Sequence, residues 1–376
     1  MRDQIPVLQP HADEETIADM ARVLRSGWWG QGPETAKAEK EFAKKVGVKY
    51  AVGCNSGTAA LDLAIKAYGL KGGELITTPF TFVSDAIVGE WHGMDVTFCD
   101  IDANSFCMDP KSLKITKNTK VIIAVDSHGR LADYDGIKKE VGKVFDITKP
   151  VGERPLILQD AAHAFLTPGA GKGGDIAIWS FQAVKSCPTG DGGMVTTDDE
   201  AIYNKLRTLT WIGVERSTFD RVNRFRYSWD YDITQAEGIK AYMNDLTAVL
   251  LNGQMRRLGE LLAKRRAVQA YYNDAFKDIN EIKTPMFSYT CQYYTMFAAN
   301  RNELIKELAD NGVATSVHFK PLYEMSYWSK GKKEPLPVCD QVWKNIISLP
   351  VFYDIRWEEV EHVVNVVRRF YGYKPI

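Results

Sequence analysis

The chain has 376 residues, with 47 Lys and Arg against 48 Asp and Glu and a formal net charge of −1. This length can accommodate two domains with a substantial core. The charge balance gives no basic field for nucleic acid or an anionic membrane. Residues 1–15 lack the apolar core of a signal peptide, and no run reaches the roughly 18 apolar residues of a membrane helix. We therefore expect a soluble, cytoplasmic protein.

The six cysteines are scattered along the chain, without a Cys-x-x-Cys pair or a regular spacing. This pattern favours neither a zinc site nor a disulfide framework, and it suits a reducing compartment. We expect no bound metal.

The first two thirds of the chain alternate short apolar runs with helical patterns. Residues 34–47 are amphipathic and end at a glycine, and residues 50–70 pass from a short strand through a turn into a helix. Further strands that lead into turns or helices are expected within residues 74–93, 95–102, 120–129, 155–165 and 175–181. Strands that alternate with helices predict an α/β fold with a parallel, helix-covered sheet. Ligands of such sheets bind beyond the carboxyl ends of the strands.

A second region begins near residue 251. Residues 252–279 read as one long, charged helix that bridges two domains. The following patterns are strand-like or helical and lie at residues 291–299, 301–312, 313–319 and 356–372. We predict a large domain at 1–250 and a smaller C-terminal α/β domain at 251–376.

Two short segments at predicted strand ends could contact a ligand. Ser56, Gly57 and Thr58 open a helix, where free backbone N–H groups and the helix dipole favour an anion such as phosphate. Ordinary N-capping would give the same pattern. Phe82 follows the next strand and could belong to the core or form a platform for a ring.

Asp160 and His163 follow the apolar residues 155–158 at the end of a predicted central strand. Burying a carboxylate in that place costs free energy of folding unless it meets a cation. Asp160 therefore either caps the next helix or faces a charged ligand.

Lys185 follows one more apolar strand, so the fold returns it to the same edge of the sheet. A lysine near low-dielectric walls can lose its proton and form a Schiff base with an aldehyde. Pyridoxal phosphate uses such a lysine, a carboxylate on its ring nitrogen and an anion site for its phosphate. The alternative is a sugar- or nucleotide-binding α/β protein whose lysine contacts phosphate.

Several segments resemble the successive signature segments of the DegT/DnrJ/EryC1/StrS family of pyridoxal-phosphate-dependent sugar aminotransferases. They are residues 55–64, 77–86, 158–165, 179–197 and 316–323. The resemblance extends from residues 26–43 to residues 349–370. It implies a fold type I aminotransferase, with a mostly parallel sheet in the large domain and a smaller C-terminal α/β domain. It also implies a homodimer with shared active sites.

The resemblance implies roles for the residues at the strand ends. Lys185 would hold pyridoxal 5'-phosphate as a Schiff base and then shuttle a proton, as a catalytic residue with Asp160 and His163. Asp160 would pair with the ring nitrogen, His163 would lie near the ring hydroxyl, and Phe82 would stack on the ring.

The resemblance also assigns residues to the cofactor's phosphate. Ser56, Gly57 and Thr58 would bind it with the Ser180 hydroxyl. Lys240 stands where many relatives carry an asparagine that reaches the phosphate of the partner subunit. A lysine could make that contact as a point charge.

Candidate substrate-binding residues lie in three other segments. Residues 213–232 carry Arg216, Arg221, Arg224 and Arg226, and of these Arg216 and Arg224 are our candidates for neutralising a diphosphate. A charge cluster of this kind can also be a solvated surface.

The other two segments resemble substrate-facing parts of the family. They contribute Trp28 and Trp29 near the start of the chain, and His318 and Lys320 in the second region.

The resemblance implies transfer of an amino group from glutamate to a nucleoside-diphosphate 4-keto-6-deoxyhexose, with 3-keto sugars as the alternative. The amino sugar would enter polysaccharide or antibiotic glycosylation. Two further alternatives are a dehydratase on the same scaffold and a non-catalytic sugar-nucleotide sensor. Lys185 argues against the dehydratase, whose lysine is replaced by histidine. The presence of both Asp160 and Lys185 argues against the sensor.

Overall fold

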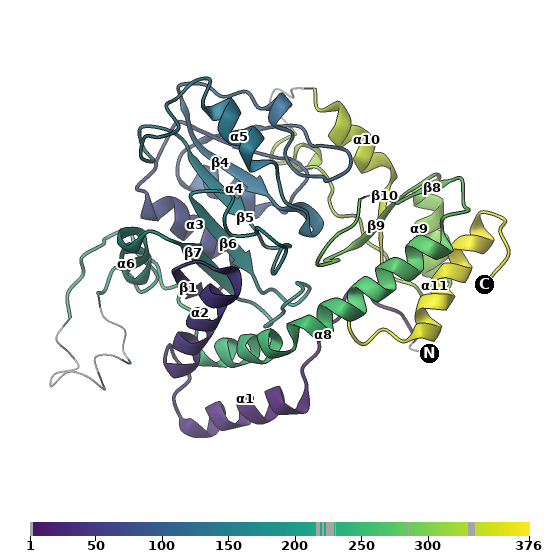
Figure 1. The fold of residues 1–376 in the computed structure, drawn as a ribbon, viewed down its shortest axis with the longest axis horizontal. Helices are drawn as coiled ribbons and strands as arrows, with labels where there is room; N and C mark the ends of the chain where they lie inside the picture. Colours follow the sequence, from purple (N-terminus) through teal and green to yellow (C-terminus); the bar gives the residue numbers. More distant parts are fainter. Residues whose placement is uncertain are drawn as a thin grey trace.

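A large mixed sheet lies at the centre of the left-hand part of the molecule in Figure 1. The computed structural model describes residues 3–215, 219, 222, 229, 231–284, 286–329 and 335–376. The strands of this sheet are β1 (Tyr50–Cys54), β2 (Glu74–Thr77), β3 (Asp95–Phe98), β4 (Thr119–Val125), β5 (Leu156–Asp160), β6 (Ile176–Ser180) and β7 (Gly193–Thr197). Their spatial order is β1-β7-β6-β5-β4-β2-β3. The pairs from β6 to β3 are parallel, whereas β7 is antiparallel to both of its neighbours, β1 and β6. The predicted α/β fold with a mostly parallel sheet is confirmed.

Helices cover both faces of this sheet. Those in the first part of the chain are α1 (Glu14–Ser26), α2 (Pro33–Val46), α3 (Gly57–Ala67), α4 (Ser84–Trp91), α5 (Tyr134–Val141) and α6 (Glu200–Leu209). Along β4, Val121 and Ile123 pack in one cluster with α3, whereas Ile122 and Ala124 pack in another with α5. Because alternate side chains of a strand point to opposite faces, β4 is buried on both sides.

Five strands of the large sheet have their carboxyl ends at the same edge. Because β7 is antiparallel to both β1 and β6, β1 runs in the same direction as β6 and therefore as β5, β4 and β2. The loops that follow these five strands consequently leave the sheet on the same side, which is where α/β folds place their ligands.

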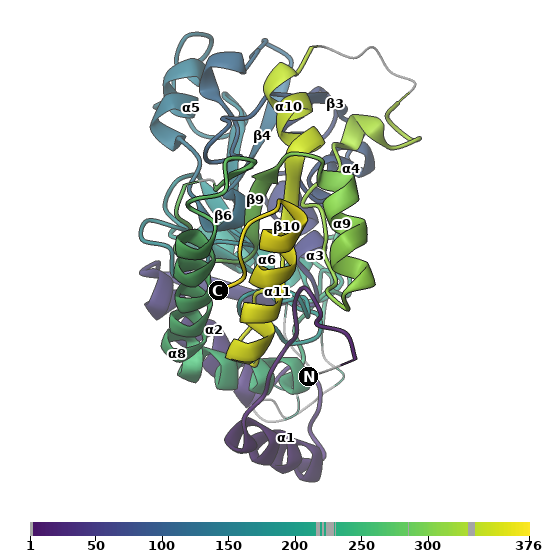
Figure 2. The same ribbon diagram turned by 90° about the vertical axis from the view of Figure 1, so that its right-hand side faces the viewer.

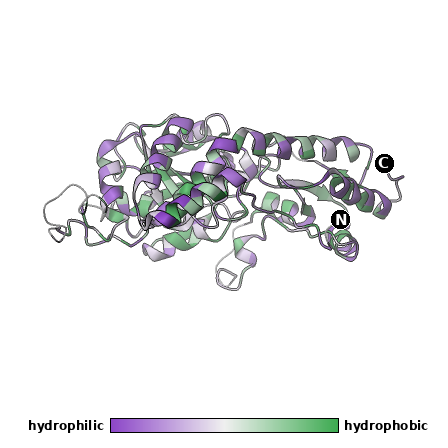
Figure 3. Cartoon of the chain, turned by 90° about the horizontal axis from the view of Figure 1, so that it is seen from below, coloured by the Kyte–Doolittle hydropathy of each residue, from purple (hydrophilic) through white to green (hydrophobic). Residues whose placement is uncertain are grey.

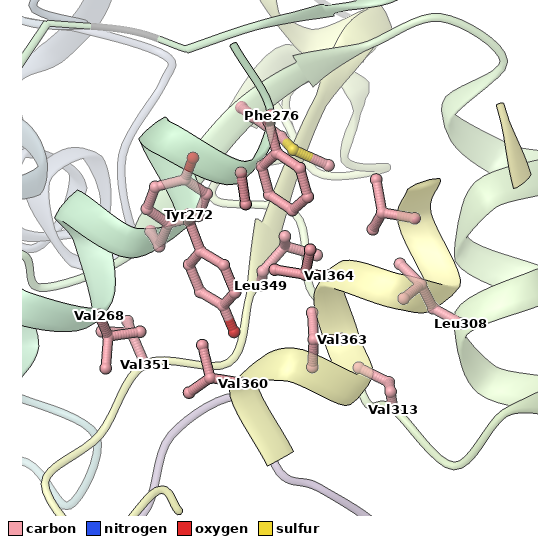
Figure 4. Packing of buried hydrophobic residues seen from close by; sticks show 14 of the residues in the cluster. Val268, Tyr272, Phe276, Leu308, Val313, Leu349, Val351, Val360, Val363 and Val364 are labelled. Carbon is pink, nitrogen blue, oxygen red and sulfur yellow. The ribbon is translucent and has the colours of Figure 1, made fainter. Parts of the chain in front are cut away.

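A second, antiparallel sheet has the order β10-β9-β8. Its strands are β8 (Ile282–Lys283), β9 (Tyr294–Ala298) and β10 (Ile346–Leu349), and the helices of this region are α9 (Arg301–Asp310), α10 (Pro337–Asn345) and α11 (Trp357–Phe370). Figure 2 shows α9 and α11 beside this sheet. Figure 4 shows its core, in which Tyr272, Phe276, Leu349, Val363 and Val364 pack together. Each such buried side chain contributes roughly 1.5–3 kcal/mol of transfer free energy.

One long helix, α8 (Asp245–Ala275), extends from the region of the large sheet to that of the second sheet (Figure 1). It packs against α1 and α2 at one end and against α11 at the other. The predicted bridging helix is therefore present. It begins earlier than residue 252 because the Asn244 side chain caps it, accepting a hydrogen bond from the Thr247 N–H at 2.9 Å.

Residues 313–319 do not form the expected strand. Val313 and Ser316 make isolated bridges with Ile5 and Ser348, and further along the chain the Leu322 N–H donates to the Pro79 carbonyl at 3.0 Å. Ile5 thereby adds the N-terminal segment to the core of the second sheet. The division of the chain at residue 250 stays a prediction.

Hydrophobic residues concentrate on the strands and the inner faces of the helices (Figure 3). Among the helices that the structure describes, none combines the length and the apolar character needed to cross a membrane.

Candidate active site

A cavity of about 460 Å³ lies at the carboxyl ends of β1, β5 and β6. Its volume is in the range of small-molecule sites. It is lined by many of the residues predicted from the sequence to bind a cofactor or substrate, namely Ser56, Gly57, Thr58, Phe82, Asp160, His163, Ser180, Lys185 and His318. The fold therefore gathers residues that are far apart in the sequence into one site.

Lys185 lies in the loop after β6, where its backbone N–H donates to the Gln182 carbonyl at 2.8 Å. Its Nζ is 2.8 Å from His163 Nε2. Burial lowers the pKa of Lys185 to about 8, against the attraction of Asp160 and Asp85. Roughly a tenth of such an amine is unprotonated near pH 7, so it can act as a nucleophile and as a base.

Residues of the second region contact His163. Its ring lies parallel to that of Phe319, with centroids 6.0 Å apart, and its carbonyl accepts a hydrogen bond from the Thr290 hydroxyl at 2.7 Å. Burial, and then the nearby charge of Lys185, lowers the pKa of His163 well below its ordinary value. The imidazole is therefore neutral near pH 7. Its Nδ1 accepts from the His128 backbone N–H at 3.4 Å, so its proton belongs on Nε2, the atom beside Lys185 Nζ.

Asp160 ends β5 in the middle of the sheet, where it pairs with Val125 of β4 and Ile178 of β6. Only 6% of the residue is exposed. The Ala162 N–H donates to its Oδ1 at 2.8 Å. Burial raises the pKa of Asp160, whereas that hydrogen bond and the charge of Lys185 favour the ionised form. The site therefore holds a carboxyl that a cation can stabilise.

The start of α3 faces the end of β6. The Ser56 hydroxyl caps the helix by accepting a hydrogen bond from the Ala59 N–H at 3.1 Å. The N–H groups of Gly57 and Thr58 belong to the first turn, which has no acceptors within the helix. A Cβ at Gly57 would lie 2.8 Å from the Ser180 Cβ and 3.1 Å from its Oγ. The glycine thus permits a close approach that makes a cradle for an anion.

Aromatic and imidazole rings also line the cavity. Phe82 lines it with 58% of its surface exposed. The His318 ring is stacked on Tyr293, with centroids 3.7 Å apart and 14° between the planes. Its Nδ1 is 2.9 Å from the Ser348 hydroxyl, and burial followed by the charge of Lys185 lowers the pKa of His318 to about 3. His318 is therefore a neutral polar group near pH 7.

Three predicted residues lie in or beside a second cavity of about 290 Å³. Trp28 and Trp29 line it with Trp211 and Tyr242. Lys240 lies next to it, with Nζ 5.5 Å from the centre of the Trp211 ring. The contact of Lys240 with the cofactor of a partner subunit stays a prediction.

The remaining substrate-binding candidates are Lys320, Arg216 and Arg224. Lys320 is exposed and is absent from the residues that line the first cavity. Arg216 and Arg224 lie outside the described residues, as do Arg221 and Arg226.

Several residues near the site were not singled out from the sequence. Tyr293 and Asp191 line the cavity, and Asp85 in α4 is an electrostatic neighbour of Asp160. Asp85 lies three residues after Phe82, within a segment that resembles the family, so it could have been noticed as an acid beside a strand end. No pattern distinguishes Tyr293 from the adjacent Tyr294.

Comparison with known proteins gives matches over almost the whole chain. Residues 10–368 match the DegT/DnrJ/EryC1/StrS aminotransferase family. The spore coat polysaccharide biosynthesis protein SpsC of Bacillus subtilis is 35% identical, over 97% of this chain and 96% of its own. The UDP-4-amino-4-deoxy-L-arabinose–oxoglutarate aminotransferase of Shewanella sediminis is 30% identical, over 98% of this chain and 99% of its own. A putative sugar aminotransferase of Streptococcus pneumoniae, solved in its PLP form, superposes with a TM-score of 0.87 at 28% identity, covering 96% of this chain and 97% of its own.

Proposed function

This chain belongs to the DegT/DnrJ/EryC1/StrS aminotransferase family, and on that premise we propose that it aminates a nucleoside-diphosphate 4-keto-6-deoxyhexose with L-glutamate as donor. Members of the family are pyridoxal-phosphate-dependent transferases, so the chain is a sugar aminotransferase of that kind. The observation that carries the proposal is the meeting of Lys185, Asp160 and the start of α3 in one cavity.

The residues of this cavity fit pyridoxal 5'-phosphate. Lys185 offers a partly neutral amine for covalent attachment, and Asp160 a carboxyl for the ring nitrogen. The close approach of Gly57 and Ser180 leaves a cradle for the phosphate that an added Cβ would fill. When bound, this cofactor supplies an electron sink for the electron pair that remains on carbon after a C–H bond loses its proton.

Lys185 is proposed to move the proton. Its Nζ would take a proton from the α-carbon of the amino donor and return one to the carbon of the sugar that receives the amine. A pKa of about 8 suits both directions near neutral pH, because neither protonation state is strongly favoured. The 2.8 Å contact with His163 holds Nζ in place.

One relative supports both amination at position 4 of the sugar and glutamate as the amino donor. The name of the Shewanella sediminis enzyme joins a 4-amino-4-deoxy sugar nucleotide to oxoglutarate, which is the keto acid left when glutamate gives up its amine. We propose that Trp28, Trp29, His318 and Lys320 contact the sugar nucleotide, together with Arg216 and Arg224. We also propose a homodimer in which Lys240 reaches the partner subunit's cofactor.

Nitrogen transfer tests this function. The purified enzyme would be incubated with L-glutamate labelled with nitrogen-15 and one acceptor at a time. The acceptors would be nucleoside-diphosphate 4-keto-6-deoxyhexoses and 3-keto sugars. We expect a labelled amino sugar nucleotide from a 4-keto acceptor, and none from the Lys185→Ala variant. Amination of a 3-keto sugar alone would refute the proposed position. Dehydration without nitrogen transfer would refute the aminotransfer.

A further inference from the structure

Asp85 is a buried carboxyl for which the roles assigned above give no reason. It lies in the first turn of α4 with none of its surface exposed. The Thr81 hydroxyl donates to its Oδ2 at 2.6 Å. Its other oxygen, Oδ1, is buried and has no hydrogen-bond partner among the described residues. An ionised carboxylate with one donor is expensive to bury, so its presence needs an explanation.

The neighbour of Asp85 is Asp160. The two carboxyl groups are electrostatic neighbours, although one comes from the first turn of α4 and the other from the end of β5. Burial, and then the negative charge of Asp160, raises the pKa of Asp85 well above its ordinary value. Lys185 is the cation that faces the pair, and it favours ionisation of both. Two adjacent carboxylates in such a place are disfavoured, whereas one proton between them removes the repulsion.

The hydrogen bonds indicate which carboxyl keeps the proton. Asp160 Oδ1 already accepts from the Ala162 N–H, a bond that favours its ionised form. Thr81 donates to Oδ2 of Asp85, so that oxygen serves as an acceptor and the proton belongs on Oδ1. Oδ1 is the oxygen that otherwise has no partner.

We propose that Asp85 is a neutral carboxylic acid whose Oδ1–H donates a hydrogen bond to Asp160 and fixes the orientation of that carboxylate toward the cofactor's ring nitrogen. This role rests on the proposed function of Asp160. Asp85 is a positioning residue, because it acts through Asp160 and does not itself line the cavity. The pair then carries one negative charge, which matches the single positive charge of a protonated ring nitrogen.

Two substitutions separate a neutral donor from a charged or merely space-filling residue. Asp85→Asn keeps the shape, can accept from Thr81 and can donate from its amide to Asp160. Asp85→Leu has a similar volume without a donor. Because Asp85→Leu removes a hydrogen bond to a charged group, we expect it to release bound pyridoxal phosphate at least about tenfold faster than wild type. Asp85→Asn should release it at a rate within about threefold of wild type.

Infrared spectroscopy of the cofactor-free protein tests the proton directly. At about pH 8, where Asp126 with a pKa of about 7 is mostly ionised, the wild-type minus Asp85→Asn difference should contain the C=O band of one buried carboxylic acid. Circular dichroism would confirm that both variants are folded. If Asp85→Leu does not fold, the infrared band and the Asp85→Asn release rate still decide the question.

The proposal is overturned by absence of that band, or by release from Asp85→Asn as fast as from Asp85→Leu. Equal, wild-type release from both variants would also overturn it. None of these readouts needs a sugar acceptor, so a wrong choice of acceptor would leave them unchanged.

Discussion

Replacing Lys185 by methionine should abolish transamination and also stabilise the cofactor-free protein. Burial lowers the pKa of Lys185 from 10.5 to about 8. At about 1.4 kcal/mol for each pH unit, retaining the cation in the folded chain costs at most about 3.5 kcal/mol. The pKa of about 8 already includes the attraction of Asp160 and Asp85, so this cost is a net one. Methionine removes the cost, but it also removes the hydrogen bond with His163. We therefore expect a net gain of about 1 kcal/mol near pH 7.

The gain should depend on pH in a defined direction. Because the pKa of Lys185 is lower in the folded chain, the unfolded chain binds more protons between about pH 8 and pH 10.5. The cost of the cation is thus fully present below about pH 8 and disappears as the pH rises to about 10.5. Urea unfolding of both cofactor-free proteins should show Lys185→Met more stable near pH 7 and a smaller difference near pH 10.

The matched control is Lys306→Met, because Lys306 is exposed on α9. It should change the free energy of unfolding by no more than about 0.5 kcal/mol at either pH. A Lys185→Met protein less stable than wild type by more than about 1 kcal/mol near pH 7 would refute the reasoning. So would a difference that does not change with pH.

Three further substitutions test the site. Asp160→Asn should keep the cofactor but reduce turnover at least about 100-fold, since an amide cannot hold a proton on the ring nitrogen; near-normal turnover would remove Asp160 from the mechanism. Gly57→Ala should weaken cofactor binding about tenfold in equilibrium dialysis, because its Cβ would lie 2.8 Å from the Ser180 Cβ. The control Gly259→Ala, whose Cβ meets no atom within 4 Å, should bind normally, and equal binding by both variants would contradict the cradle. Thr290→Val should lower the free energy of unfolding by about 1–3 kcal/mol, because the buried His163 carbonyl loses its 2.7 Å donor. An unchanged urea midpoint would show that this bond contributes nothing.

The sequence predicted a mostly parallel sheet because its strands are short apolar runs that alternate with helical patterns. Residues 156–160 of β5 are buried on both faces, so an acid at the end of that run, Asp160, stood out. The direction of β7 was not predicted, although the chain between β6 and β7 has no helical pattern. A parallel return normally needs a crossover helix, so an antiparallel return could have been read from this loop.

Side-chain direction limited what could be predicted of the site. Lys185, Asp160 and Gly57 were recognisable because each is an unusual residue at a strand end. Asp85 was not, because the first turn of a helix can point an acid to solvent or inward with the same sequence. Its burial depends on how α4 packs against β2 and β3, which the sequence of that first turn does not indicate.

Two substrate segments show the same limit. Trp28 and Trp29 were predicted to meet the sugar nucleotide, yet within one chain they line a separate cavity. Sequence patterns place residues on elements but do not fix the distance between two loops.

The visible absorption spectrum tests the central claim most directly. The purified protein, supplied with pyridoxal phosphate, would be recorded before and after L-glutamate, and then with a panel of nucleotide 4-keto sugars. We predict a band from the Lys185-bound cofactor that L-glutamate bleaches and one of the sugars restores. Absence of the band with cofactor present, or a band that no amino donor bleaches, would contradict the assignment of Lys185 and of the cavity around it.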